Sequence, residues 1–186
     1  MLNDLFNHPR LRRIWLKVRY PLALLFLVFL LRYVHADMLL PAFLVSLFGE
    51  LIQTWSFASL VKNTELTVRG PYVLVRNPMY LGRYFLGLGF VLLFGNLWLI
   101  IIYTVVYVLY MVNRVKREEA RLVELLPGYD DYRRKVHAFL PGPGVYQESP
   151  LWYFDWATLQ MNHGDRNFIV FLLIYAGIAA YVLLLG

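Results

Sequence analysis

Residues 70–82, with the sequence GPYVLVRNPMYLG, decide how the rest of the chain is interpreted. The segment opens with a glycine–proline turn, and its apolar run at residues 73–75 is too short to span a bilayer. Asn77 followed by Pro78 is typical of a helix start, because asparagine is a preferred N-cap and proline is favoured at the first helical position. We expect a membrane helix from Pro78 to about Phe94, with its N-terminus available to an anionic ligand group.

A second polar segment, RVKREEARL at residues 114–122, is separated from the first by two apolar runs. Only Gly95 and Asn96 join these runs, so we expect a hairpin of two membrane helices. The second helix should begin at Leu97 and continue beyond the membrane through Leu126. The hairpin would bring both polar segments to one face of the bilayer, where we expect the active site.

The composition is that of a membrane protein. Of the 186 residues, 60% are hydrophobic and 16% are charged, whereas soluble domains average about half apolar and about a quarter charged. The chain contains no cysteine, which excludes disulfides, thiolate metal sites, cysteine nucleophiles and lipid anchors on cysteine. The four histidines lack the spacing of metal ligands, so we expect no metal site.

The net charge of +6 comes from basic residues that alternate with the apolar runs. They precede the first run and follow the second and the fourth, and only Arg32 falls on the other side. This positive-inside pattern predicts a multi-pass protein of a cytoplasmic membrane, prokaryotic in view of the chain's small size. The N-terminus and both polar segments would then face the cytoplasm. The expected partner is the bilayer, including anionic lipid, and not nucleic acid.

We predict an all-α integral membrane protein with about five transmembrane helices and a small cytosolic cofactor-binding cap. Residues 1–186 should form a single membrane domain. Its expected parts are an interfacial helix at 1–20, spans one and two at 21–60, a cofactor-binding core with spans three and four at 61–141, and an interfacial segment with span five at 142–186. Span five itself is expected at residues 168–185, after a polar loop at residues 162–167.

The second span, at about residues 39–60, contains Glu50 and Gln53. A carboxylate inside a span costs about 2.5–3.5 kcal/mol on insertion scales, so it normally faces the interior of the bundle or a wet cavity. Glu50 would then either pair with a neighbouring arginine for packing or line a cavity. The sequence leaves both alternatives open.

Five ordered blocks of sequence carry a family resemblance. They are FGE at residues 48–50, GPY at 70–72, RNPMYLG at 76–82, EExxL at 118–122 and GYxxYxxxVxxFLP at 128–141. With these blocks the chain resembles the isoprenylcysteine carboxyl methyltransferases and their phospholipid methyltransferase relatives. The resemblance covers about half of the chain, and it is more specific for the superfamily than for any one substrate.

The resemblance implies a site for S-adenosylmethionine (SAM) on the cytosolic side and a lipophilic methyl acceptor that enters from the bilayer. It assigns the cofactor to Thr64, Glu65, Leu66, Thr67, Tyr72, Arg76, Asn77, Pro78, Met79, Tyr80, Gly82, Glu118 and Glu119. Arg114 would orient the acceptor, and Glu50, Gln53 and Tyr132 would also contact it. The expected catalytic residues are Arg114 and Glu118, which stand four residues apart on one helix face.

The chain departs from the family pattern in two places that concern the acceptor. Asn77 stands where eukaryotic members usually have histidine, and asparagine does not titrate near neutral pH. Gln53 stands where many relatives carry arginine, which leaves the charge of the acceptor open. A carboxylate acceptor needs no general base, whereas for an amine, thiol or hydroxyl the candidate bases are Tyr80, Tyr132 and His137.

Two other functions remain open. One is an NADPH-dependent sterol or lipid double-bond reductase, since such enzymes share the R-x-P-x-Y-x-G pattern, although Arg83 replaces the glutamate common after their glycine. The other is a non-catalytic accessory module of the membrane. No G-x-G-x-x-G follows a strand, so a Rossmann-type cofactor fold is not expected. The acceptor atom and the oligomeric state are not determined by the sequence.

Overall fold

The computed structural model describes residues 18, 21, 25, 28–61, 65–142 and 149–185. The predicted interfacial helix at residues 1–20 and much of the predicted first span lie outside these residues, except for single positions. The described chain continues as helix to Leu31 and then turns into the short 3-10 helix η1 (Ala36–Met38). Within the described ranges every regular element is a helix.

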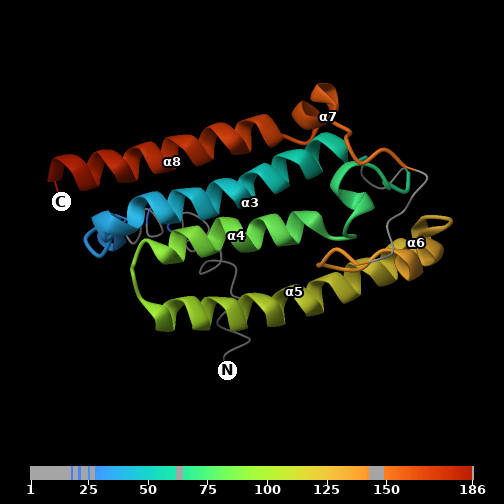
Figure 1. Ribbon diagram of the computed structural model, residues 1–186, viewed down its shortest axis with the longest axis horizontal. Coiled ribbons are helices and arrows are strands. Elements are labelled where there is room, and N and C mark those ends of the chain that lie inside the picture. The colour runs from blue at the N-terminus through green and yellow to red at the C-terminus, as the bar shows by residue number, and fades with distance from the viewer. Residues whose placement is uncertain are drawn as a thin grey trace.

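Four long helices lie side by side and alternate in direction (Figure 1). They are α3 (Leu39–Ser59), α4 (Pro78–Leu92), α5 (Leu97–Leu125) and α8 (Gly164–Leu185). In the order of the layer, α8 packs on α3, α3 packs most extensively on α4, and α4 packs on α5. The short elements η2 (Gly70–Val73), α6 (Tyr129–Lys135) and α7 (Trp156–Met161) gather at one end of the bundle, which we call the polar end.

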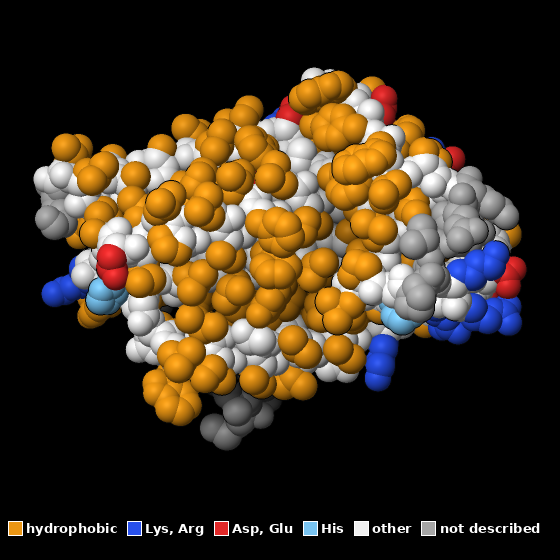
Figure 2. All heavy atoms as spheres, viewed as in Figure 1, with side chains coloured by type: hydrophobic (Ala, Val, Ile, Leu, Met, Phe, Trp, Pro, Cys, Tyr) orange, Lys and Arg blue, Asp and Glu red, His pale blue; other side chains and the backbone are white. Residues whose placement is uncertain are grey.

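The outer surface of this bundle suits a bilayer. The helical stretches Ala36–Ser59, Leu97–Leu125 and Gly164–Leu184 are long and apolar enough to cross a membrane, while α4 has 15 residues against the ~20 that a bilayer core needs. Figure 2 shows apolar side chains over the middle of the molecule and most visible Lys and Arg side chains at the polar end. The all-α membrane fold is confirmed, and the count of five spans stays a prediction.

Small residues allow α3 and α4 to approach closely. A Cβ atom on Gly49 would overlap the backbone nitrogen of Leu86, and one on Gly82 would lie 2.7 Å from the carbonyl oxygen of Gly49. Deeper in the bundle, Gly89 lies against Ser46, whose hydroxyl donates to the carbonyl of Leu86 at 3.0 Å. This contact fixes the position of α4, and therefore of its N-terminus at the polar end.

The helix boundaries follow the sequence closely in the centre of the chain and less closely near its end. α4 starts at Pro78 and α5 starts at Leu97, as predicted. The predicted loop at residues 162–167 is wrong from residue 164 onward, because α8 already begins at Gly164. His163 has a φ of 60°, which separates α7 from α8. Asp165 lies in the first turn of α8, where the helix dipole favours a carboxylate.

The short helix α7 was not predicted. Its N-cap is Asp155, whose carboxylate accepts a hydrogen bond from the backbone N–H of Thr158 at 2.6 Å. The side-chain amide of Asn162 then donates to the carbonyls of Phe57 and Leu60 at 2.9 and 2.8 Å. These bonds attach the segment before α8 to the last turn of α3.

Candidate functional site

A cavity of about 140 Å³, the polar cavity, lies at the polar end between the start of α4 and the last turns of α5. Of the residues assigned to the cofactor by resemblance, it is lined by Glu65, Leu66, Thr67, Tyr72, Arg76, Asn77, Pro78, Met79, Tyr80 and Glu118. Gly82 and Glu119 lie outside its lining, and Thr64 lies outside the described residues. Segments far apart in the sequence thus meet around one cavity, as the predicted hairpin requires.

Glu118 lines this cavity on the side that α5 forms. The Tyr80 hydroxyl, from the first turn of α4, donates to Glu118 Oε2 at 2.6 Å. The Tyr107 hydroxyl donates in turn to the carbonyl oxygen of Tyr80 at 2.7 Å. The two helices of the hairpin are therefore joined by hydrogen bonds directly beside the cavity, and Glu118 is oriented by one of them.

Glu119, the next residue, has a different environment. The Arg76 guanidinium binds its carboxylate through Nε at 3.0 Å and Nη2 at 2.9 Å, and the amide of Asn77 donates to Oε1 at 3.1 Å. The Arg76 and Glu119 side chains are only 11% and 12% exposed. A charge pair so shielded from water needs its hydrogen bonds to be satisfied, and here Glu119 accepts from two residues of the α4 entry.

Arg76 also connects the entry of α4 to α6. Its Nη1 donates to the carbonyl oxygen of Arg133 at 2.6 Å and to that of Val136. The backbone N–H groups of Arg76 and Asn77 donate to the carbonyls of His137 and Ala138 at 2.9 and 3.1 Å. We call this set of contacts around Arg76 and Glu119 the Arg76 latch, and it holds α6 against the start of α4.

Asn77 is the N-cap residue of α4, as predicted, but its side chain makes no capping hydrogen bond. The amide turns to Glu119 instead, at 3.1 Å. The sequence pattern therefore located the start of the helix correctly and gave the wrong partner for the side chain. The competing partner comes from α5, forty-two residues away in the chain.

Three tyrosines around the cavity have a raised pKa. Burial raises the pKa of Tyr72, Tyr129 and Tyr132, and the nearby Glu118 carboxylate adds to the effect at Tyr72. The Tyr132 hydroxyl donates to the carbonyl oxygen of Tyr72 at 2.6 Å and is 2% exposed as a residue. Tyr132 is thus placed to support the η2 backbone rather than to accept a proton at neutral pH.

Glu50 and Gln53 lie away from this cavity, in the interior of α3. Gln53 Nε2 donates to Glu50 Oε2 at 3.2 Å, and Glu50 is 2% exposed. Within the described residues, Glu50 Oε1 has no hydrogen-bond partner and no arginine pairs with this carboxylate. Of the two predicted alternatives, the arginine pair is thus absent among the described residues, and Glu50 does not line the polar cavity. A cavity-lining role for Glu50, and its contact with the acceptor together with Gln53, stay predictions.

A second cavity, of about 260 Å³, lies on the outer side of Glu118, and we call it the arginine cavity. Its lining consists of Arg114, Arg117, Glu118, Arg121 and Leu122. Glu118 and Leu122 line both cavities, so they form the wall between the two. Arg114, predicted to orient the acceptor, lies in this second cavity and not in the first.

Several residues of the site were not predicted from the sequence. Leu122, Leu126 and Tyr129 line the polar cavity, and Arg117 and Arg121 line the arginine cavity. For the arginines a signal exists, because positions 114, 117 and 121 fall on one face of a helix. For the others only the observed packing of α6 against α5 reveals the contact.

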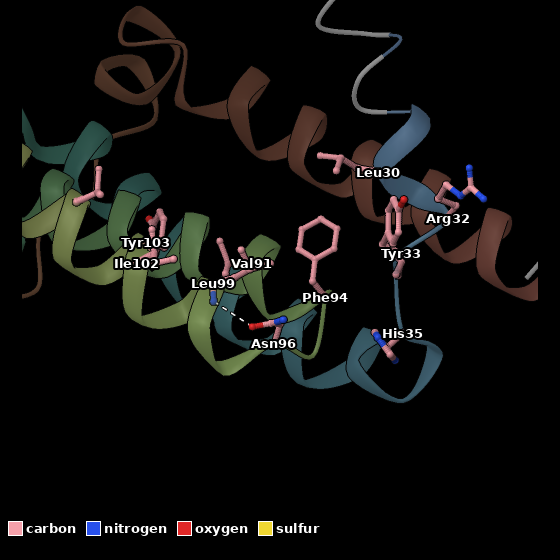
Figure 3. A pocket seen from close by; sticks show the side chains of 12 residues that line it. Leu30, Arg32, Tyr33, His35, Val91, Phe94, Asn96, Leu99, Ile102 and Tyr103 are labelled. Carbon is pink, nitrogen blue, oxygen red and sulfur yellow. Dashed lines mark hydrogen bonds between the residues drawn. The ribbon is translucent and has the colours of Figure 1, made fainter.

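A larger cavity, which is apolar, lies at the opposite end of the bundle. It measures about 780 Å³ between the end of the first described helix, the end of α4 and the start of α5. Phe94, Tyr33 and Leu30 project around it in Figure 3, and Asn96 on its edge accepts a hydrogen bond from the backbone N–H of Leu99 at 3.2 Å. None of the predicted site residues lines it.

Comparisons with known proteins agree with the expected family. Residues 39–127 match the sequence model of the phospholipid methyltransferase family. The chain is similar to the nickel-cobalt-cadmium resistance protein NccN of Alcaligenes xylosoxydans xylosoxydans, with 26% identity over 104 residues, 56% of this chain and 49% of the relative. It is equally similar to the cobalt-zinc-cadmium resistance protein CzcN of Cupriavidus metallidurans, with 26% identity over 56% of this chain and 48% of the relative.

A third relative is the protein-S-isoprenylcysteine O-methyltransferase of Schizosaccharomyces pombe, with 33% identity over 81 residues, 43% of this chain and 34% of the relative. The chain thus matches about half, or less, of the length of these curated relatives. No solved structure matches the chain. The predicted resemblance is confirmed by the family match and by the yeast relative.

Proposed function

We propose that this chain is a SAM-dependent methyltransferase that acts on a lipophilic acceptor dissolved in the bilayer. The observation that carries the proposal is the position of Glu118. Its carboxylate receives the Tyr80 hydroxyl at 2.6 Å and lines a cavity made largely of residues that the family resemblance assigns to the cofactor. The match of residues 39–127 to the phospholipid methyltransferase family supports the same activity.

The chemistry of the polar cavity fits SAM. Tyr72 and Tyr129 offer aromatic surface and Leu66 offers apolar contact for an adenine ring. Glu118 offers a carboxylate to hydroxyl or cationic groups. The volume of about 140 Å³ is below the ~300–1,000 Å³ of most ligand pockets, so the walls must move apart to hold the whole cofactor.

The residues of the chain would act by positioning. When bound, SAM would supply the methyl group from its sulfonium, with S-adenosylhomocysteine as the second product. In our proposal Glu118 holds the cofactor and Arg114 orients the acceptor. Glu119 acts indirectly, because the Arg76 latch, to which it belongs, fixes the start of α4 beside the cavity.

We place the polar end in the cytoplasm of a prokaryotic cell. The basic residues of the chain support this orientation, since Arg76, Arg114 and Arg121 line the cavities of the polar end and Arg133 contacts Arg76 there. The relatives from two bacteria support the prokaryotic setting. In this orientation a soluble cofactor reaches the polar cavity from the cytoplasm, and a lipophilic acceptor reaches it from the bilayer.

The test is a calorimetric and thermal-shift titration of the detergent-purified protein with S-adenosylhomocysteine and, in parallel, with NADPH. A ligand that binds only the folded state raises its stability by about 2.7 kcal/mol at a hundredfold excess over Kd. We expect a shift with S-adenosylhomocysteine that is lost in Glu118→Ala. The matched control is Glu124→Ala, since Glu124 is exposed on the same helix and lines neither cavity.

Each outcome separates the alternatives. A shift with NADPH alone would assign the site to a lipid or sterol reductase. No shift with either ligand would favour a non-catalytic membrane module. A shift with S-adenosylhomocysteine that persists in Glu118→Ala would support the proposed cofactor and show that Glu118 does not contribute to its binding.

A further inference from the structure

The apolar cavity of about 780 Å³, at the end of the bundle opposite the polar cavity, opens to the surroundings of the helices. Ile102 and Val106 belong to its lining and are 57% and 60% exposed. In a membrane these surroundings are lipid acyl chains, and the cavity volume lies within the ~300–1,000 Å³ of most ligand pockets. An acyl chain can therefore enter this space from the side.

Arg32 lies at the edge of the apolar cavity without a counter-charge. Its guanidinium carbon lies 5.5 and 5.6 Å from the ring centroids of Phe29 and Tyr33, which hold the side chain in place but supply no negative charge. In Figure 3 the Arg32 side chain extends outward at the edge of the cavity. Among the described residues no ion pair includes Arg32, and the next acidic residue in the sequence, Asp37, is not paired with it. The described residues of the lining include no carboxylate, so positive charge is in excess there.

The other polar side chains at this edge have hydrogen-bond donors to offer. The side-chain oxygen of Asn96 accepts from two backbone N–H groups in the first turn of α5, at 2.9 and 3.2 Å, so its amide nitrogen is the group left for a ligand. The Tyr33 hydroxyl and the His35 imidazole have no hydrogen-bond partner among the described residues, and both can donate. A ligand that presents several acceptor oxygens would satisfy this edge.

We propose that the apolar cavity binds one anionic phospholipid, whose phosphate is bound by Arg32 and whose acyl chain fills the space between the first described helix and the hairpin of α4 and α5. The ester and glycerol oxygens of the lipid would accept hydrogen bonds from His35 and Asn96. Guanidinium groups bind phosphate oxygens through charge-assisted, often bidentate hydrogen bonds. Since lipid tails are as apolar as the side chains of the lining, the head group supplies the selectivity.

This lipid is not the methyl acceptor. Asn96 precedes the first residue of α5 and Glu118 lies near its other end, so the two are about 33 Å apart along the helix at 1.5 Å per residue. In the proposed orientation the lipid belongs to the outer leaflet, whereas the polar cavity opens at the cytoplasmic side. The inference therefore goes beyond the proposed function and does not depend on it. It also accounts for Arg32, the basic residue that departs from the positive-inside pattern.

A lipid in this cavity would join two segments that are distant from the polar end. The backbone N–H of His35 donates to the carbonyl oxygen of Leu93 at 2.9 Å, which links the turn after the first described helix to the end of α4. A lipid bound by Arg32 on one segment and Asn96 on the other would add a second link. Because it binds the folded state, it should raise the thermal midpoint.

The test uses the full chain, purified in neutral maltoside detergent and depleted of lipid. Three probes with the same acyl chains are added in turn: dioleoylphosphatidylglycerol, dioleoylphosphatidylcholine and dioleoylglycerol. A fourth probe, glycerol 3-phosphate, carries the phosphate without a chain. Native mass spectrometry measures the retention of each probe. We expect phosphatidylglycerol to bind about tenfold more tightly than the other two lipids, and glycerol 3-phosphate not to be retained.

Variants locate the binding. Arg32→Gln should lose the preference for phosphatidylglycerol and the rise of the thermal midpoint that this lipid causes. Asn96→Asp keeps a side-chain oxygen for the cap of α5, because aspartate is an equally good N-cap, but it replaces the amide donor by a negative charge and should also weaken this binding. The matched control is Lys116→Gln, which removes an exposed charge of α5 outside the cavity lining and should keep the preference. Without lipid, all three variants should melt close to the wild type, which shows that they fold.

Four results would overturn the inference. Equal retention of phosphatidylglycerol and dioleoylglycerol would mean that the cavity takes any apolar chain, and equal retention of phosphatidylglycerol and phosphatidylcholine would remove the selectivity for an anion. A preference that survives in Arg32→Gln, or falls equally in Lys116→Gln, would mean that Arg32 is not the binding group. A dimer that excludes the lipid would assign the cavity to a second copy of the chain. None of these results changes the outcome of the S-adenosylhomocysteine titration, which tests the proposed function separately.

Discussion

The two ends of the hairpin formed by α4 and α5 each contain a cavity, and the two differ in size and chemistry. The apolar cavity of about 780 Å³ is lined mainly by aliphatic and aromatic side chains (Figure 3). The polar cavity of about 140 Å³ gathers Glu118, Arg76, Asn77 and several tyrosines from four segments of the chain. In a membrane a large apolar hollow is filled by lipid at little cost, so convergent polar groups indicate a functional site better than volume does.

The same contrast recurs between two adjacent residues at the polar end. Glu119 is buried in the Arg76 latch, with its oxygens bound by Arg76 and Asn77. Glu118 is exposed on α5, lines both cavities of the polar end and receives a hydrogen bond from Tyr80. One carboxylate holds the structure, and the other faces the space where ligands would bind.

The largest expected effect is on the latch. Glu119→Ala leaves the guanidinium of Arg76 buried without its counter-charge, which costs about 3–5 kcal/mol of stability in comparable sites. Reversible unfolding in detergent, followed by tryptophan fluorescence, measures the loss. Glu124→Ala, at an exposed position, should stay within about 0.5 kcal/mol of the wild type, and an equally mild result for Glu119→Ala would contradict a structural role.

The second effect concerns activity without stability. Glu118→Ala should lower kcat/KM for methyl transfer about a hundredfold, which corresponds to about 2.7 kcal/mol. Its thermal midpoint should remain near that of the wild type, because Glu118 is exposed and the Tyr80 hydroxyl can turn to water. Activity is measured as transfer of labelled methyl into extracted membrane lipids. If Glu118→Ala lowered stability as well as activity, Glu118 would have a structural role like that of Glu119, and the proposed difference between the two carboxylates would be wrong.

A third prediction compares the two cavities directly. Leu122→Phe adds volume to the wall of the polar cavity and should weaken S-adenosylhomocysteine binding about tenfold. Ile102→Phe makes a similar change in the lining of the apolar cavity and should leave this affinity within about twofold. Isothermal titration of both variants with S-adenosylhomocysteine measures the two affinities. A larger loss of affinity for Ile102→Phe than for Leu122→Phe would indicate that the cofactor binds at the apolar cavity and contradict our assignment.

The smallest effect is on pH dependence. Because burial raises the pKa of Tyr72, Tyr129 and Tyr132 above the ordinary value of about 10, these phenols stay protonated in the folded protein while they ionise in the unfolded chain. The unfolding free energy should thus be insensitive to them between about pH 7 and 9, and should fall above about pH 10. Absorbance of phenolate at 295 nm should show fewer ionised tyrosines in the folded protein than in the denatured one.

Much of the central fold was predictable, because it is encoded locally. Asn77-Pro78 predicted the start of α4, Gly95-Asn96 predicted the hairpin, and continuous hydrophobicity predicted α3 and α5. The helix α7 and the early start of α8 were not predicted. Asp155 caps α7 through a local bond that the aromatic composition around it obscured, and Asn162 binds the end of α3.

The site was predictable as a set of residues and not as a set of contacts. The family blocks brought together most of the lining of the polar cavity, including Tyr80 and Glu118. They did not distinguish the roles of Glu118 and Glu119, because that difference depends on which side of α5 faces the start of α4. Arg117 and Arg121 were overlooked for a similar reason, as their common face becomes significant only once a cavity lies on it.

The unbroken length of α5 has a consequence for the surrounding membrane. Its 29 residues extend over about 43 Å, while the hydrocarbon of a typical bilayer is about 30 Å thick. By this length, Glu118 and the arginines at 114, 117 and 121 lie on the part of α5 that extends beyond the hydrocarbon, and this part is continuous with the membrane-embedded part of the same helix. Lipids with longer acyl chains would cover more of this rod and bring the interface closer to Glu118, so acyl-chain length becomes a control on how deeply an acceptor must rise to be methylated.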